Sequence, residues 1–142
     1  MILRHNVFLK YFLLFFLGGF TYGAVEILSR GFSHISMFLA GGVCFIGIGL
    51  INEVLPEDTS LISQMFLSAI IVTLVEFLVG CVVNLWLGLH VWDYSKLPYN
   101  LYGQICLLFS CFWFFLSLPA IFLDDYLRYK VFKEDKVKYK IL

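Results

Sequence analysis

The sequence predicts an all-α fold, a polytopic membrane protein in which four transmembrane helices form a bundle in one domain over residues 1–142. Composition is the first observation behind this prediction, because 61% of the residues are hydrophobic and only 14% are charged. A soluble domain averages roughly 45–50% apolar and about 25% charged residues. The second observation is four long apolar runs separated by short polar segments. A soluble domain of this length keeps too much surface in water to hide so many apolar side chains.

The apolar runs are long enough to cross a bilayer as helices. A hydrocarbon core of about 30 Å requires about 20 apolar residues in a helix. Helices are expected because backbone polar groups in lipid must pair within their own segment. The third run is the longest, so its helix is expected to tilt or to protrude from the membrane. The expected spans are residues 11–28, 37–54, 61–89 and 105–123.

The basic residues predict the orientation of the bundle. An even number of spans places both ends of the chain on one side, and Lys and Arg mark the cytoplasmic side. We therefore expect cytoplasmic N- and C-termini, with a cytoplasmic basic tail over residues 124–142. The formal net charge is zero, so no global basic field suggests nucleic acid as a partner. The basic residues near the two ends are Arg4, Lys10, Arg128, Lys130, Lys133, Lys136, Lys138 and Lys140.

Small residues recur at helical spacing within the spans. Helices in lipid associate through close packing at such residues. The pattern is compatible with packing inside one bundle and with a face between two copies of the chain, and the sequence does not separate these. The glycines expected to pack between helices are Gly19, Gly23, Gly42, Gly49, Gly80 and Gly88.

Glu76 is the most informative ionisable residue, because it lies near the middle of the third apolar run. A charge at the bilayer centre costs about 2.5–3.5 kcal/mol on insertion scales. Glu76 is therefore expected to face the bundle, to be protonated, or to pair with a cation or a hydrogen-bond donor. One interpretation is a proton-coupled or cation-binding carboxylate, and the other is a hydrogen-bonded clasp between helices.

Other polar residues share the predicted depth of Glu76 or lie closer to the outer surface. Glu26 and Arg30 have the i,i+4 spacing of a helical ion pair, which is also typical of a simple helix end. The loop of residues 89–104 is rich in aromatic and hydrogen-bonding side chains, so it could fold back as a cap and bring Asp93 to Arg30. The predicted pocket for a ligand or an ion consists of Glu26, Arg30, His34, Glu76, Asn84, Trp92, Asp93, Asn100 and Gln104.

The sequence has none of the common catalytic or metal-binding patterns. It contains no GxSxG, no HExxH, no Walker loop and no Gly-rich phosphate-binding fingerprint. Its four cysteines lie in apolar runs without CxxC spacing, so we interpret them as small packing residues. We expect no catalytic residue, no metal and no cofactor. An enzyme acting on lipid or cell-wall precursors stays an alternative, although no nucleophile–base pair is visible from the spacing.

Four blocks of the sequence carry a resemblance to a known family. They are EILSRGFSHISM at residues 26–37, GGVCF with GLINE at residues 41–53, the segment 76–106 with its NLWLG and VWDYS motifs, and DDYLRY at residues 124–129. Together they resemble the bacterial family named putative ABC-transporter type IV, also called CmpB-like or putative ABC transporter permease. Leu107 departs from the family pattern, which often has proline there.

The resemblance implies a small protein of the bacterial inner membrane with a transport-related role. It brings no substrate and no catalytic residue, and any coupling to ATP would need a separate ATPase subunit. The predicted function is a transporter or permease component with a polar pocket in the outer half of the bundle, acting as a homodimer or with another subunit. The alternative is a non-transporting scaffold that recruits another membrane component.

Overall fold

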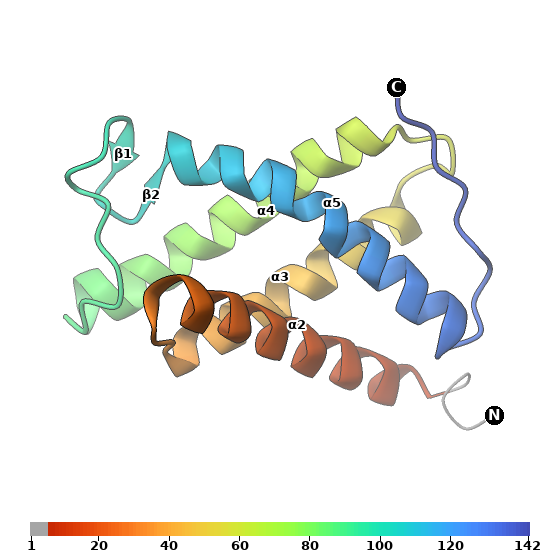
Figure 1. The fold of residues 1–142 in the computed structure, drawn as a ribbon, viewed down its shortest axis with the longest axis horizontal. Helices are drawn as coiled ribbons and strands as arrows, with labels where there is room; N and C mark the ends of the chain where they lie inside the picture. The colour runs from red at the N-terminus through yellow and green to blue at the C-terminus, as the bar shows by residue number, and fades with distance from the viewer. Residues whose placement is uncertain (1–5) are drawn as a thin grey trace.

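The computed structural model describes residues 6–142, and within them four helices are long and apolar enough to cross a membrane. Successive helices run in opposite directions, so α2 begins at the same end of the molecule as the C-terminus (Figure 1). The predicted all-α membrane bundle is confirmed. The helices are α2 (Val7–Arg30), α3 (Ile35–Val54), α4 (Leu61–Gly80) with its π-helical extension η1 (Cys81–Trp86), and α5 (Leu107–Lys130).

Local sequence explains where the helices begin and end. The side chain of Asn6 accepts a hydrogen bond from the Leu9 N–H at the start of α2, and Ser60 accepts one from the Ser63 N–H at the start of α4. Such caps satisfy backbone donors that have no partner within the helix. α2 ends at Gly31, whose φ of 82° suits a residue without a Cβ.

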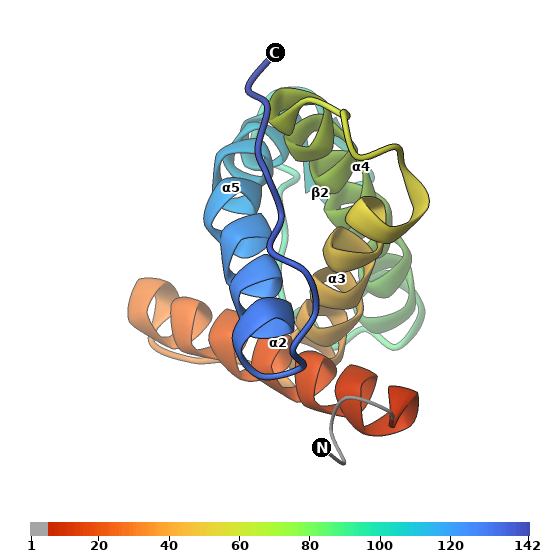
Figure 2. The same ribbon diagram turned by 90° about the vertical axis from the view of Figure 1, so that its right-hand side faces the viewer.

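The bundle consists of two helix pairs joined through α3. α2 packs mainly on α3, and α4 packs on α5, while α3 also contacts α4 and α5. α2 and α5 are much less closely associated, and the two views show them on either side of the bundle axis (Figures 1 and 2). On one side of the bundle, α2 and α5 therefore flank α3 without packing closely against each other.

Pairs of adjacent glycines let α2 and α3 approach closely. A Cβ added at Gly18 would lie 2.4 Å from the Cβ of Phe45, and one added at Gly41 would lie 2.6 Å from the Cβ of Tyr22. Neither Gly18 nor Gly41 was among the expected packing glycines. The sequence pattern did not predict the roles of Gly18 and Gly41, because small-residue spacing does not show which face of a helix meets its neighbour.

Gly80 lies against the loop residues Gln104 and Trp92, and three of the six expected packing glycines lie in close helix contacts, which are Gly19, Gly42 and Gly49. Gly23 does not, because the nearest atom to an added Cβ would be Ser33 Oγ at 3.9 Å. Gly88 lies after η1 with a φ of 66° and nothing within 4 Å, so its role is conformational.

The helix bounds differ from the expected spans at several places, because α2 begins at Val7 rather than residue 11 and the other starts shift by up to two residues. The third span ends at Trp86 rather than residue 89, and the following loop reaches the short antiparallel strands β1 (Asn100–Leu101) and β2 (Ile105–Cys106). α5 continues to Lys130 rather than ending at residue 123. It continues because its acidic and basic side chains pair with one another inside the bundle. We call the end that carries residues 87–106 the loop end, and the opposite end the tail end.

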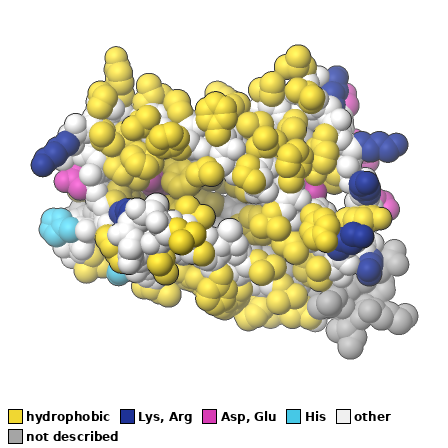
Figure 3. Space-filling view, viewed as in Figure 1, with side chains coloured by type: hydrophobic (Ala, Val, Ile, Leu, Met, Phe, Trp, Pro, Cys, Tyr) yellow, Lys and Arg dark blue, Asp and Glu magenta, His cyan; other side chains and the backbone are white. Residues whose placement is uncertain are grey.

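The exterior matches a protein surrounded by lipid. In the space-filling view, hydrophobic side chains cover the middle of the molecule and most Lys and Arg side chains gather at the tail end (Figure 3). Four aromatic rings of α2, at Phe8, Phe12, Phe16 and Phe20, are exposed on one helical stripe. Such surface would be unfavourable in water but is ordinary in a bilayer.

Candidate functional site

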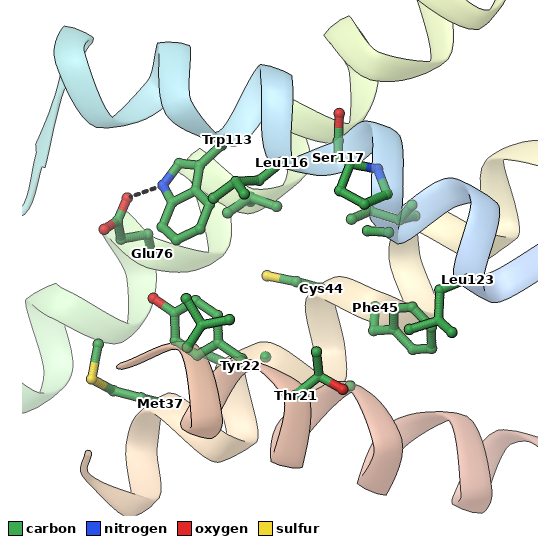
Figure 4. A pocket seen from close by; sticks show the side chains of 18 of the residues that line it. Thr21, Tyr22, Met37, Cys44, Phe45, Glu76, Trp113, Leu116, Ser117 and Leu123 are labelled. Carbon is green, nitrogen blue, oxygen red and sulfur yellow. Dashed lines mark hydrogen bonds between the residues drawn. The ribbon is translucent and has the colours of Figure 1, made fainter. Parts of the chain in front are cut away.

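A cavity of about 330 Å³ lies between the four helices. Its floor is α3, its two side walls are α2 and α5, and α4 contributes two residues. Figure 4 shows the side chains converging on this space, with Glu76 at one end and Phe45 and Leu123 toward the other. The lining is largely apolar, with Glu76 as its one carboxylate among the lining residues.

The cavity opens sideways between α2 and α5. Val25 on α2 and Leu116 on α5 line it, yet they are 46% and 47% exposed. Thr21 and Pro119 also line it and are exposed. In the space-filling view the molecule is hollowed between α5 above and α2 below (Figure 3). The opening therefore lies in the apolar middle of the bundle, where the surroundings are lipid.

Glu76 is buried, with only 9% of its surface exposed, and it is held by two neutral donors. The Tyr94 hydroxyl donates to Oε1 at 2.8 Å, and the Trp113 indole N–H donates to Oε2 at 3.0 Å. The Tyr22 ring lies 5.7 Å from the Trp113 ring, with its hydroxyl directed toward the Glu76 end of the cavity (Figure 4). Glu76 thus links α4 to α5 and to the loop while remaining at the cavity wall.

Tyr94 shows that the loop folds back onto the bundle, as the sequence suggested. Its ring stacks on Phe109 of α5 at 4.6 Å while its hydroxyl reaches Glu76. Burial raises the pKa of the Tyr94 phenol well above its usual range, and the nearby Glu76 carboxylate makes the next largest contribution. Tyr94 was not among the predicted pocket residues, because its position in a long loop gave no sign of its depth.

A second hydrogen-bond network fixes the base of the loop beside the cavity. The Asn84 side chain donates to Gln104 Oε1 at 2.8 Å and accepts the Val91 N–H at 2.7 Å. The Trp92 indole N–H donates to the Gln104 carbonyl at 2.9 Å. The π-helical turn of η1, a rare geometry that is frequent at functional sites, carries Asn84 into this network. Asn84 and Gln104 therefore support the loop, and Trp92 contributes to the cavity wall.

The expected ion pair between Arg30 and Asp93 is wrong. Within the described residues, Arg30 Nε lies 2.7 Å from Glu26 Oε2, and Arg30 also donates to the Val91 carbonyl at 3.3 Å. Asp93 is exposed and accepts the Ser95 N–H at 2.8 Å. That hydrogen bond holds the pKa of the Asp93 carboxyl below its usual range. The i,i+4 spacing on one helix brings Glu26 to Arg30, whereas Asp93 lies on the exposed side of the loop and caps its own turn.

The remaining predicted pocket residues have local roles. His34 caps α3 by accepting the Ser36 N–H, and Asn100 donates to the Leu97 carbonyl and accepts the Gly103 N–H within the loop. Of the nine predicted residues, only Glu76 and Trp92 line the cavity. Glu26 and Arg30 pair near its loop end, while the others shape the loop or the helix ends.

A second polar cluster, which the sequence did not predict, lies at the tail end, where Asp124 and Arg128 were expected to belong to a cytoplasmic basic tail. Both are buried, and Arg128 Nε donates to Asp124 Oδ2 at 2.8 Å. Arg128 also pairs with Glu53 of α3, and Lys10 of α2 pairs with Glu53 and with Glu134. The available signal was the i,i+4 spacing of Asp124 and Arg128 combined with Glu53 at the end of a span on the same side.

The chain after α5 is tied to this cluster. Residues 131–142 cross the tail end in an extended path between α5 and the start of α4 (Figure 2). The Tyr139 hydroxyl donates to Asp125 Oδ2 at 2.7 Å, and the Leu61 N–H donates to the Lys140 carbonyl at 2.6 Å. Burial and the contact with Asp125 raise the pKa of Tyr139 above its usual range. Within residues 6–142, neither polar cluster forms a group of three His, Cys, Asp or Glu side chains placed to hold a metal ion.

A sequence model of the family described as "Putative ABC-transporter type IV" matches residues 10–139. The chain belongs to this family. The match covers α3, α4 and α5 in full, α2 from Lys10 onward, and every residue that lines the cavity. Neither the curated proteins nor the solved structures contain a match to the chain. Membership in the type IV family confirms the resemblance and indicates an ABC-transporter-related membrane protein.

Proposed function

We propose that this protein is the membrane-embedded, ligand-binding component of a transport system. The cavity between α2 and α5 is the binding site, and Glu76 is its polar anchor. The observation that carries this proposal is the position of Glu76, a buried carboxylate at the wall of an otherwise apolar cavity that opens out of the bundle.

The cost of burying Glu76 supports a role beyond packing. A charged side chain at the bilayer centre costs about 2.5–3.5 kcal/mol on insertion scales, and intramembrane ionisable residues are functional candidates for that reason. The hydrogen bonds from Tyr94 and Trp113 offset part of this cost. If Glu76 only linked the helices through hydrogen bonds, close packing on every side of it would be the most stable arrangement. Here the carboxylate instead borders a cavity of about 330 Å³, which is large enough for a small ligand.

Any coupling to ATP is proposed to lie in a separate subunit, whereas coupling to protons would use Glu76 of this chain. The sequence has no phosphate-binding loop, and the four helices account for most of the chain. An ATPase partner would supply ATP hydrolysis. A second copy of the chain would supply further helices, because four helices alone leave little room for a transport path. We also propose that the protein lies in the bacterial inner membrane with the tail end in the cytoplasm, because Lys and Arg are concentrated there.

Carbodiimide labelling of the protein in lipid nanodiscs tests access to the site. Dicyclohexylcarbodiimide is an apolar reagent that modifies protonated carboxyl groups, so it should label Glu76 through the lateral opening. Mass spectrometry should find the adduct on Glu76 in the wild type and in Glu57→Gln, whose exposed side chain lies in a turn outside the cavity. Absence of labelling on Glu76 would argue against an accessible site.

Transport itself requires a flux measurement. Proteoliposomes containing a pH-sensitive dye should show proton flux with the wild type and with Glu57→Gln, and little with Glu76→Gln. Equal flux with Glu76→Gln would overturn the assignment of Glu76. No flux from any variant, together with a stable membrane partner that copurifies equally with Glu76→Gln, would favour the scaffold alternative.

A further inference from the structure

We infer that the ligand of this cavity is a single-chain cationic amphiphile, which enters from the lipid between α2 and α5 and places its ammonium group beside Glu76. The inference rests on the proposed function, because it names the class of molecule bound at that same site. Three observations support it: the direction of the opening, the size of the apolar space, and the charge at its end.

The opening faces lipid. Its exposed border residues are Val25 on α2 and Leu116 and Pro119 on α5, all within membrane-spanning helices. At the loop end the cavity stops at the buried Trp92, and toward the tail end it stops at Phe45 and the residues before the Asp124–Arg128 pair. A water-soluble ligand would have to cross hydrocarbon to reach this opening, whereas a molecule dissolved in the bilayer can diffuse to it in the membrane plane.

The space fits one slender apolar chain rather than a two-chain lipid. An engineered apolar cavity of about 150 Å³ binds benzene, and this cavity is about 330 Å³. Its floor and walls are formed by apolar or small residues such as Gly41, Cys44 and Ile48 of α3 and Ala120 of α5. These side chains offer dispersion contacts to a hydrocarbon chain along the cavity.

The polar end of the cavity favours a cation. Among the described lining residues Glu76 is the one that can carry a full negative charge, and none is Lys or Arg. Arg30, the one Lys or Arg of the predicted pocket, pairs with Glu26. A carboxylate has about four acceptor sites, and Tyr94 and Trp113 use two of them.

Aromatic rings beside Glu76 suit an ammonium group. The rings of Tyr22 and Trp113 lie 5.7 Å apart and both line the cavity next to the carboxylate (Figure 4). The face of an aromatic ring attracts a cation, most strongly when the site is shielded from water. A ligand carboxylate in the same place would meet the negative charge of Glu76, and a neutral alcohol would gain only a hydrogen bond.

Photo-labelling with three matched probes tests this inference. Decylamine, decanol and decanoic acid, each carrying a diazirine near the chain end, are added to the protein in lipid nanodiscs, and labelled peptides are identified by mass spectrometry. We expect the amine to label residues at the cavity end away from Glu76, such as Phe45, Ala120 and Leu123, at least about tenfold more than the acid does, because charge interactions strengthen away from water. Glu76→Gln should remove this preference, so that the amine labels the cavity no more than decanol does.

Two adjacent substitutions on α3 separate the cavity from the lipid-facing surface. Cys44→Phe fills the cavity and should abolish labelling by the amine. Val43→Phe adds similar bulk at a residue that is 50% exposed outside the cavity, so labelling should remain. If Cys44→Phe does not fold, competition of the diazirine amine by excess unlabelled decylamine in the wild type provides the same test.

The outcomes distinguish this inference from the proposed function. Equal labelling by all three probes, or an amine preference that survives in Glu76→Gln, would overturn the inference. So would efficient cross-linking of Val25→Cys to Leu116→Cys of a second copy, since the opening would then be a subunit interface. Flux without amine labelling would retain the proposed function alone, and amine labelling without flux would retain a binding site but not transport.

Discussion

At the scale of single residues, Asp124 and Glu76 are both buried carboxylates, and the protein stabilises them in different ways. Asp124 is fully buried and has a guanidinium partner, because Arg128 Nε lies 2.8 Å from its Oδ2. Glu76 has two neutral donors and borders a cavity. Asp124 therefore has a charge partner within the protein, whereas Glu76 retains acceptor capacity toward the cavity. We assign Asp124 to stability and Glu76 to ligand binding.

Arg128→Gln should strongly destabilise the protein. Removing one partner of a buried ion pair costs about 3–5 kcal/mol, because the other charge remains buried without compensation. Thermal unfolding in detergent would measure the loss, with Lys130→Gln as the control because Lys130 is exposed on the same helix. Adding Asp124→Asn to Arg128→Gln should recover part of the stability. Equal stability of Arg128→Gln and Lys130→Gln would show that the tail-end cluster is not stabilising.

At the scale of elements, the most extensive helix contact is between α2 and α3, where glycines replace side chains. An added Cβ at Gly41 would lie 2.6 Å from the Tyr22 Cβ, and one at Gly23 would lie 3.9 Å from its nearest neighbour, Ser33 Oγ. The two glycines therefore differ in their tolerance of a methyl group. The contact also positions Tyr22 at the cavity.

Gly41→Ala should destabilise the bundle by about 1–3 kcal/mol, as overpacking of a close contact does. Gly23→Ala should be neutral or stabilising by up to about 1 kcal/mol, because alanine favours the helix and has room. Comparing the two variants by thermal unfolding in detergent checks the prediction. A similar loss in both would mean that the α2–α3 contact lies on the face that contains Gly23.

The tail acts on α4 as a backbone cap. The Leu61 N–H donates to the Lys140 carbonyl at 2.6 Å, so an extended segment satisfies a donor at the start of a helix. Deleting residues 138–142 should accelerate hydrogen exchange at Leu61 by up to about tenfold, because one hydrogen bond contributes about 0.5–1.5 kcal/mol. The Ser63 N–H, which is capped by Ser60 Oγ, is the internal control and should not change. Unchanged exchange at Leu61 would show that the tail does not protect this helix end in solution.

At the scale of the whole molecule, the two ends of the bundle have different chemistry. The loop end closes with aromatic rings and neutral hydrogen bonds, whereas the tail end closes with ion pairs and carries Lys10 and the six basic residues of the C-terminal segment. The cavity lies between these ends and opens to the side. A ligand drawn from the membrane plane needs no passage through either closed end in order to bind.

This polarity predicts the topology. In a variant lacking the native cysteines, Lys96→Cys at the loop end should react with a membrane-impermeant maleimide on intact spheroplasts. Lys138→Cys at the tail end should react only after permeabilisation, because Lys and Arg favour the cytoplasmic side. Both positions are exposed, so reactivity reports the side of the membrane rather than burial. The reverse labelling pattern would overturn the proposed orientation.

The residues that define the fold are recognisable in the sequence because their signal is local. Apolar runs of sufficient length predict membrane helices without knowledge of their neighbours, and Glu76 is conspicuous because a charge within such a run is costly. The Glu26–Arg30 pair is local as well, since both residues lie on one helix. The exact helix ends are less predictable, because Asp124 and Arg128 continue α5 only by pairing with each other inside the bundle.

Composition and periodicity thus determined a four-helix membrane protein with a carboxylate inside it. Only the tertiary structure decided which side chains meet: Tyr94 and Trp113 hold Glu76, Glu26 rather than Asp93 pairs with Arg30, and Asp124 joins a charged cluster. The reason is that these contacts depend on the rotation of each helix about its axis and on the path of the loop. Hydrophobicity requires the helices to be in the membrane, but close packing of glycines and pairing of distant polar groups select one arrangement among many.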